Sequence, residues 1–203
     1  MSASTWVSKP ICSNPLTLFG WCAFLLLGCA PDPTPNPLSH PTYASADSTT
    51  VNVVIEIPAG SNDKVEIDKV SGVFEINRVI QYLPYPVNYG FIPSTLAGDG
   101  DALDVLVLSK RLETGTVLSA IPIATMILRD KGDMDDKVLL VPADSTLRVV
   151  PCDTWSCLQT EYPAIVQMLE IWFTTYKPAG EMVSGGWVDA DSTRQLILNT
   201  TLD

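Results

Sequence analysis

Three aspartates, Asp99, Asp101 and Asp104, lie within six residues of one another. Carboxylates at this spacing repel one another and raise one another's pKa values unless a cation lies among them. Their oxygens are hard ligands of the kind that Mg²⁺, Mn²⁺ and Ca²⁺ take in proteins. An EF-hand loop is excluded, because the segment has no glycine at its sixth position and no glutamate at its twelfth. The spacing therefore indicates either a divalent-metal site or a solvated acidic turn.

A second acidic group follows, interrupted by two lysines, and consists of Asp130, Lys131, Asp133, Asp135, Asp136 and Lys137. Basic and phenolic side chains lie before, within and after the two groups. Lys and Arg bind phosphate oxygens through charge-assisted hydrogen bonds, and a tyrosine hydroxyl can donate one more. Each of these residues taken singly fits an ordinary surface or core position, and it is their joint order that favours a site: Lys64, Arg78, Tyr85, Tyr89, Lys137, Tyr176 and Lys177.

The composition limits which other chemistry the chain can perform. Its 203 residues are 46% hydrophobic, enough for one compact domain with a buried core, and this excludes wholesale disorder. Acidic residues outnumber basic ones 23 to 12, so we expect no general nucleic-acid binding, which needs a basic face. The single histidine, His40, excludes histidine-based triads and zinc sites built on several histidines.

The elements that must position these residues are mostly strands, followed by helices. Alternating or continuous apolar runs predict strands, and the helical spacing from Ile165 to Tyr176 predicts an amphipathic helix over 162–176. A second, short helix is predicted after Asp189. The pattern indicates an α+β, mainly β, domain over 50–203, either open or a small closed barrel with helices packed on it. The predicted strands are 51–57, 65–68, 74–79, 105–108, 117–128 and 138–141.

The first residues look like an export signal. Residues 1–28 carry one charge, Lys9, and their densest apolar run, 21–27, is shorter than the roughly 20 residues that span a bilayer. The run ends in Leu26-Leu27-Gly28-Cys29, which resembles the lipobox of bacterial lipoproteins. That resemblance implies cleavage before Cys29 and lipidation of Cys29; the alternatives are a signal without lipid or an uncleaved anchor.

A proline-rich stretch then follows, and we expect residues 29–49 to be an extended tether. Together with the lipid, this predicts a protein anchored in a bacterial cell envelope that faces the periplasm or the exterior. In such an oxidising compartment Cys152 and Cys157 could form a local disulfide. Two free thiols are the alternative that the sequence leaves open.

The domain resembles the soluble family I inorganic pyrophosphatases over seven segments that occur in the family's order. The segment 99–104 matches the signature D-G-D-P-x-D, with Ala102 where the family usually has proline. The N-terminal segment and the stretch 148–160 lie outside the resemblance. The remaining matches are 54–58 around Glu56, 64–68 with Lys64 and Glu66, 77–78 with Arg78, 85–90 with Tyr85 and Tyr89, 130–137 with Asp130, Asp135 and Lys137, and Tyr176-Lys177.

The resemblance implies a small closed five-stranded OB-like barrel with flanking helices and Mg²⁺-dependent hydrolysis of pyrophosphate. It also implies the role of each residue. Asp101 would orient or deprotonate the attacking water, beside Tyr89 and Arg78. The metal ligands would be Glu56, Asp99, Asp104, Asp130 and Asp135; the phosphates would be bound by Lys64, Arg78, Tyr89, Lys137, Tyr176 and Lys177; and Glu66 and Tyr85 would support them.

Electrostatics leads to the same chemistry. Removal of residues 1–28 takes away only Lys9, so the mature chain has 23 acids, 11 bases and a net charge of −12. Such a chain repels pyrophosphate unless divalent cations neutralise the acids, and those cations would also acidify a bound water. Hard carboxylate oxygens accept Mn²⁺ or Zn²⁺ as well as Mg²⁺.

Two other functions stay open from the sequence: a metal-binding envelope lipoprotein with the same fold but no turnover, and a broader phosphohydrolase. A homo-oligomer is also open, because bacterial members of the family are often hexamers.

Overall fold

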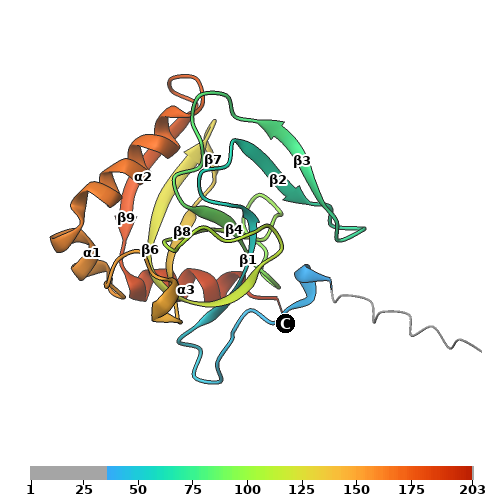
Figure 1. The fold of residues 1–203 in the computed structure, drawn as a ribbon, viewed down its shortest axis with the longest axis vertical. Coiled ribbons are helices and arrows are strands. Elements are labelled where there is room, and N and C mark those ends of the chain that lie inside the picture. Colours follow the sequence, from blue (N-terminus) through green and yellow to red (C-terminus); the bar gives the residue numbers. More distant parts are fainter. Residues whose placement is uncertain (1–35, 203) are drawn as a thin grey trace, which may run out of the picture. The chain divides into compact units, whose positions relative to one another are not determined.

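The computed structural model describes residues 36–202, and its centre is a closed ring of five strands (Figure 1). β1 pairs with β4, β4 with β5 and β8 with β6 in antiparallel fashion, and β5 with β8 in parallel. The pairing of β6 with β1 closes the ring. The predicted closed five-stranded arrangement with flanking helices is therefore confirmed. The ring strands are β1 (Val51–Ile57), β4 (Asn88–Ile92), β5 (Leu103–Val107), β6 (Val117–Asp130) and β8 (Lys137–Pro142).

Two hydrophobic cores lie on opposite sides of the central strands. In β5, Val105 belongs to one core and Leu106 to the other, and in β8 Leu140 and Leu139 divide in the same way. Strands that are buried on both faces carry continuous apolar runs rather than an alternating pattern. This is why 105–108 and 138–141 show no polar face in the sequence.

Three helices cover the ring. α1 (Trp155–Glu161) and α2 (Pro163–Thr175) contribute to one core, and they lie beside β9 (Met182–Val188), which extends the sheet along β6 (Figure 1). α3 (Ala190–Thr200) is capped by Asp189, whose side chain accepts a hydrogen bond from the Ser192 backbone N–H, and it packs Ile197 into the other core. Two of these helices, α2 and α3, lie where the sequence predicts them. A short strand, β7 (Asp133–Met134), completes the sheet.

A β-hairpin stands outside the ring as a separate two-stranded sheet. It consists of β2 (Asp63–Ile67) and β3 (Phe74–Val79), and its register places Lys64 opposite Arg78. Gly72 in the connecting turn has a φ of 71°, a conformation that glycine adopts without strain. The hairpin lies to one side of the ring (Figure 1).

The described part of the predicted tether, residues 36–49, differs from the extended spacer that the sequence indicates. Thr42 is buried, and Tyr43 forms a β-bridge with Val51. Proline has no N–H to donate, but its carbonyl still accepts a hydrogen bond, and Pro41 accepts one from the side chain of Asn52 at 2.8 Å. Residues 41–43 are therefore held against the domain, whereas residues 31–35 of the proline-rich run lie outside the described residues.

The predicted signal 1–28 and Cys29 lie outside the described residues. Among residues 36–202, none of the helices is both long enough and apolar enough to cross a membrane.

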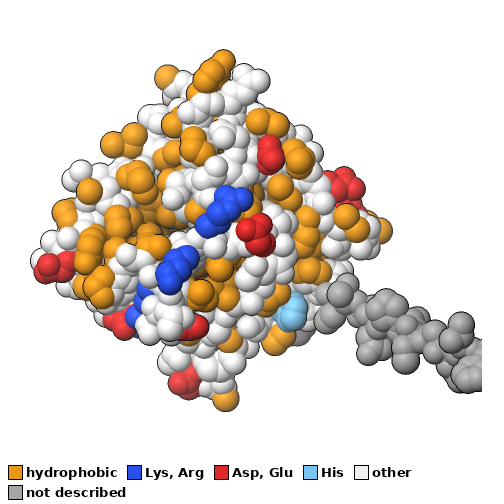
Figure 2. All heavy atoms as spheres, in the orientation of Figure 1, with side chains coloured by type: hydrophobic (Ala, Val, Ile, Leu, Met, Phe, Trp, Pro, Cys, Tyr) orange, Lys and Arg blue, Asp and Glu red, His pale blue; other side chains and the backbone are white. Residues whose placement is uncertain are grey.

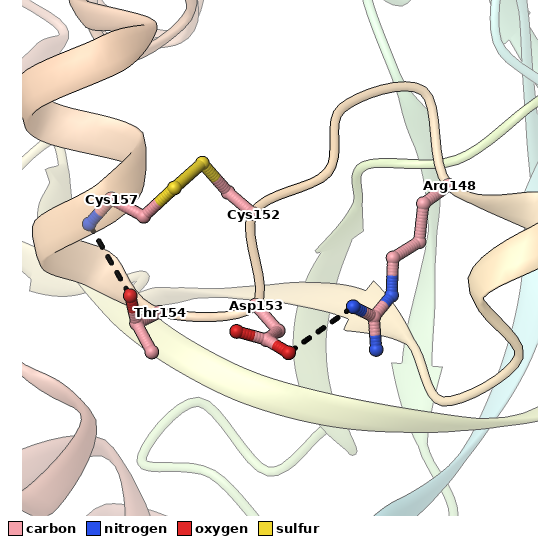
Figure 3. The surroundings of a disulfide bond; sticks show 5 residues. All are labelled: Arg148, Cys152, Asp153, Thr154 and Cys157. Carbon is pink, nitrogen blue, oxygen red and sulfur yellow. Dashed lines mark hydrogen bonds and ion pairs between the residues drawn. A yellow bond between two sulfur atoms is a disulfide. The ribbon is translucent and has the colours of Figure 1, made fainter.

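Cys152 and Cys157 form a disulfide in the structure, so of the two alternatives that the sequence leaves open the structure contains the bonded pair (Figure 3). The bond joins the segment before α1 to its first turn. Thr154 caps the same helix by accepting a hydrogen bond from the Cys157 backbone at 3.3 Å. Arg148 adds an ion pair with Asp153 at 3.3 Å (Figure 3). Covalent and polar contacts thus fix the start of α1.

The closeness of β4 to β1 gives a test of the ring. A Cβ on Gly90 would lie 1.9 Å from the backbone oxygen of Val54, so Gly90→Ala should lower the free energy of unfolding by about 3 kcal/mol. A Cβ on Gly98 would meet nothing within 4 Å, so Gly98→Ala is the matched control and should change stability little. Urea unfolding of both variants measures the difference. Equal stabilities for the two variants would contradict the close packing of β1 against β4.

Candidate active site

A cavity of about 260 Å³ opens between the ring, the β2–β3 hairpin and the end of α2. On the face of the molecule in Figure 2 charged side chains are scattered among hydrophobic ones, whereas in the cavity acids and cations are concentrated. Every residue that the sequence analysis places in the site lines this cavity: Glu56, Lys64, Glu66, Arg78, Tyr85, Tyr89, Asp99, Asp101, Asp104, Asp130, Asp135, Lys137, Tyr176 and Lys177.

The parallel pairing of β5 with β8 brings two acidic segments together. Val105 lies opposite Val138, so Asp104 and Lys137, one residue earlier on each strand, lie at the same edge of the sheet. The Lys137 ammonium donates to Asp104 Oδ2 at 2.6 Å and to Asp135 Oδ1 at 2.5 Å. Two acids that would otherwise repel each other therefore share one cation.

Lys137 is only 3% exposed, so its charge depends on these two partners. Burial alone lowers the pKa of Lys137, but attraction to Asp104 and Asp135 outweighs this effect and raises the pKa above its ordinary value. Asp135 responds to burial in the opposite direction: burial raises its pKa, against the attraction of Lys137. The ammonium stays charged at any physiological pH.

Glu56 lies in β1 and is 7% exposed, with its carboxylate turned toward the hairpin. The Ile67 backbone N–H donates to Glu56 Oε1 at 2.9 Å, which ties β2 to the ring. Burial raises the pKa of Glu56 to about 8, and the hydrogen bond from Ile67 only partly opposes this shift. Without a cation beside it, Glu56 is therefore mostly protonated at neutral pH.

The hairpin supplies cations to the other side of the cavity. Lys64 and Arg78 are cross-strand partners, and Lys64 pairs with Glu66. Lys69, just beyond β2, pairs with Asp101 and donates to the Gly100 carbonyl at 3.2 Å. Lys69 is a cavity residue that the sequence analysis does not select, because its position in a turn resembles that of any surface lysine.

An aromatic cluster holds the end of α2 against the ring. The Trp172 ring packs against Tyr85, with centroids 4.8 Å apart, and stacks on Tyr176 at 4.7 Å. Trp172 Nε1 also donates to the Pro84 carbonyl at 2.9 Å. Burial raises the pKa of both Tyr85 and Tyr89, so their phenols stay protonated and can act as hydrogen-bond donors. Residues 176 and 177 are thereby brought to the cavity.

Asp130 shows that the acids can accept a cation. It pairs with Lys177 through Oδ2, but its Oδ1 is buried and has no hydrogen-bond partner among the described residues. An unpartnered buried carboxylate oxygen is costly unless something else binds it. Asp133 and Asp136 do not line this cavity, and Asp136 instead accepts a hydrogen bond from the Leu128 backbone at 3.0 Å.

Within residues 36–202, no group of three or more histidine, cysteine, aspartate or glutamate side chains is close enough together to hold a metal ion without rearrangement. Lysines lie among the acids instead. The donor set nevertheless suits a divalent cation, because it consists of hard carboxylate oxygens and includes the unpartnered Asp130 Oδ1.

Comparison with known proteins adds independent evidence. The sequence profile of the family described as inorganic pyrophosphatase matches residues 53–202. The chain belongs to the inorganic pyrophosphatase family. An inorganic pyrophosphatase from Neisseria meningitidis serogroup B is 38% identical over 161 residues, which cover 77% of this chain and 89% of the relative. One from Aquifex pyrophilus is 39% identical over 151 residues, covering 72% and 81%.

Solved structures of pyrophosphatases have the same fold. The enzyme from Thermus thermophilus matches with a TM-score of 0.74 and 32% identity, over 81% of this chain and 96% of that one. The enzyme from Neisseria gonorrhoeae matches with a TM-score of 0.72 and 35% identity, over 80% and 95%. Members of this family need divalent metals, generally Mg²⁺.

Buried Glu56 makes the stability of the metal-free protein depend on pH. Its pKa rises from an ordinary 4.5 to about 8 on folding, so the folded state binds the proton more tightly than the unfolded state does. The stabilisation that this proton gives the folded state is fully present below about pH 4.5, and it is lost as the pH rises to about 8. Glu56→Gln keeps a neutral side chain, so it should gain stability over the wild type progressively between these pH values.

Urea unfolding in EDTA at pH 5, 7 and 9 measures this difference. Glu75→Gln, on the exposed surface of β3, is the control for loss of a carboxylate. If the free energies of unfolding of Glu56→Gln and the wild type differ by the same amount at all three pH values, the pKa of Glu56 is not raised on folding.

Proposed function

We propose that this protein hydrolyses inorganic pyrophosphate to two phosphates. The observation that carries the proposal is the cavity itself, in which acids of the ring face cations from the hairpin and from the end of α2. A small anion with phosphate at each end can be bound by cations from several sides. The family membership and the pyrophosphatases at 38% and 39% identity support the same reaction.

The acids Glu56, Asp99, Asp104, Asp130 and Asp135 are proposed to hold divalent cations, with Mg²⁺ as the main one and Mn²⁺ or Zn²⁺ as substitutes. When bound, such a cation neutralises the charge of the acids and the substrate, and it acidifies water in the site. Phosphoryl transfer requires little covalent participation by the protein, so catalysis relies on positioning and on charge stabilisation.

The chain's own cations bind and orient the substrate. Lys64 and Arg78 approach from the hairpin, Lys177 from the end of α2, and Lys137 from the base of the cavity. The phenols of Tyr89 and Tyr176 can donate hydrogen bonds to phosphate oxygens, while Glu66 and Tyr85 hold Lys64 and the aromatic cluster in place. Contacts on several sides favour the linear alignment of the attacking and leaving oxygens that the reaction needs.

Asp101 is proposed as the proton acceptor. It lies in the loop before β5 at the edge of the cavity. Water attacks one phosphorus atom, its proton passes to Asp101, and the bond from that phosphorus to the bridging oxygen breaks. Two phosphate ions leave, and the proton is returned to solvent.

We also propose that the protein is a lipoprotein of a bacterial cell envelope. The support is the sequence Leu26-Leu27-Gly28-Cys29 after an apolar run, and the proline-rich residues that follow. Pyrophosphate would then be removed outside the cytoplasm. A homo-oligomer fits the family, and sedimentation of the purified protein would test it.

Asp101→Asn should lower the rate of Mg²⁺-dependent phosphate release about 10²–10⁴-fold, the usual range for loss of a general base. Full-length protein in detergent is assayed with pyrophosphate, with and without Mg²⁺. Asp191→Asn is the matched control, because Asp191 is highly exposed on α3 and does not line the cavity. Full activity of Asp101→Asn would remove this residue from the mechanism. Absence of phosphate release from the folded wild type would favour the metal-binding alternative.

Cys29→Ser should abolish incorporation of radioactive fatty acid when the gene is expressed in a bacterium. Cys12→Ser is the control, because Cys12 also lies in the predicted signal and should leave labelling intact. If the Cys29→Ser protein is labelled as strongly as the wild type, the lipid is attached elsewhere or the signal is of another kind.

A further inference from the structure

Leu38 lines the cavity, although it lies before the part of the chain that matches the family. The family profile begins at residue 53, and Leu38 belongs to a 3₁₀ turn, η1 (Pro37–Ser39), fifteen residues earlier. One apolar side chain that lines the cavity therefore comes from a segment that the family profile does not contain.

Hydrogen bonds to the ring fix the segment that follows this turn. The Asn52 backbone donates to the Thr42 carbonyl at 2.8 Å, and Thr42 Oγ1 donates to the Pro93 carbonyl at 3.1 Å. Ser94 Oγ donates to the His40 carbonyl at 2.8 Å. The chain just after η1 is therefore tied to both β1 and the segment after β4, which limits how far Leu38 can move from the cavity.

On its other side η1 reaches the turn of the hairpin. The Asn36 side chain accepts a hydrogen bond from the Leu38 backbone at 3.0 Å, which holds the turn in shape. A Cβ on Gly72 would lie 3.3 Å from Asn36 Cγ, so Asn36 is in contact with the β2–β3 turn. The same turn region carries Lys69, which pairs with Asp101. Leu38 thus lies where the hairpin and the aspartate loop approach each other.

We propose that Leu38 is a specificity-determining residue that restricts the site to inorganic pyrophosphate and excludes longer polyphosphates. This inference rests on the proposed function. Most of the cavity's polar lining can bind anionic oxygens through lysine, arginine or tyrosine, or through a cation held by aspartate. Leucine offers no donor, so a third phosphoryl group placed against it would lose hydration without gaining a hydrogen bond.

Two substitutions in the full-length protein test the proposal in opposite directions. Leu38→Ala opens the wall and should raise the ratio of kcat/KM for tripolyphosphate to kcat/KM for pyrophosphate about tenfold, the lower end of the effect of small volume changes in a pocket. Leu38→Trp fills the space and should lower the same ratio. If Leu38 had only a structural role, each substitution would change kcat/KM for pyrophosphate and for tripolyphosphate by the same factor. The ratio would then be unchanged in both variants.

The control is Leu198→Ala on α3, a leucine that is 58% exposed and does not line the cavity. Unfolding midpoints of all proteins check that each variant is folded, and if Leu38→Ala does not fold, the Leu38→Trp result decides. If the folded variants have the same ratio as the wild type, the proposal about Leu38 is wrong. Pyrophosphate hydrolysis by the wild type would in that case still support the proposed function. A wild type that releases no phosphate from pyrophosphate would overturn both.

Discussion

The acids of the cavity repel one another, and the arrangement of the site depends on how that repulsion is balanced. Among the described residues the balance is provided by lysines: Lys137 lies between Asp104 and Asp135, Lys177 pairs with Asp130, and Lys69 with Asp101. Divalent cations would compete with these ammonium groups for the same oxygens. Where a cation took a carboxylate oxygen that now pairs with a lysine, that lysine would become available to an anionic substrate.

This balance requires segments far apart in the chain to be held at one place. Parallel pairing of β5 and β8 aligns two acidic segments, and the bond from Ile67 to Glu56 brings the hairpin to the ring. Stacking of Trp172 on Tyr176 holds the end of α2 at the third side of the cavity. Strand pairing, packing and a few hydrogen bonds thus bring the charged groups of three separate segments into one cavity.

The sequence predicts most strands and the polar residues of the site well, because periodicity and residue type are local properties. Short or irregular elements are not predicted from the sequence. β4 carries Gly90 and the polar Asn88, and β9 contains Gly185 and Gly186, so neither shows a continuous strand-like run. α1 depends on the Thr154 cap and the disulfide more than on an apolar face. Leu38 and Lys69 belong to the cavity only through tertiary contacts, for which no local pattern exists.

The strand β6 is fourteen residues long and pairs with β1, β8, β7 and β9. Its pairing of Val51 with Ala120 closes the ring across a large separation in sequence. Contacts this distant form slowly, because the entropy of closing the intervening chain is lost before the contact stabilises anything. Until residues 117–130 are in place, β1 has an open apolar edge on which another chain could add a strand. We therefore expect the pairing of β6 with β1 to form late in folding, and until then the unpaired edge of β1 exposes a newly made chain to aggregation.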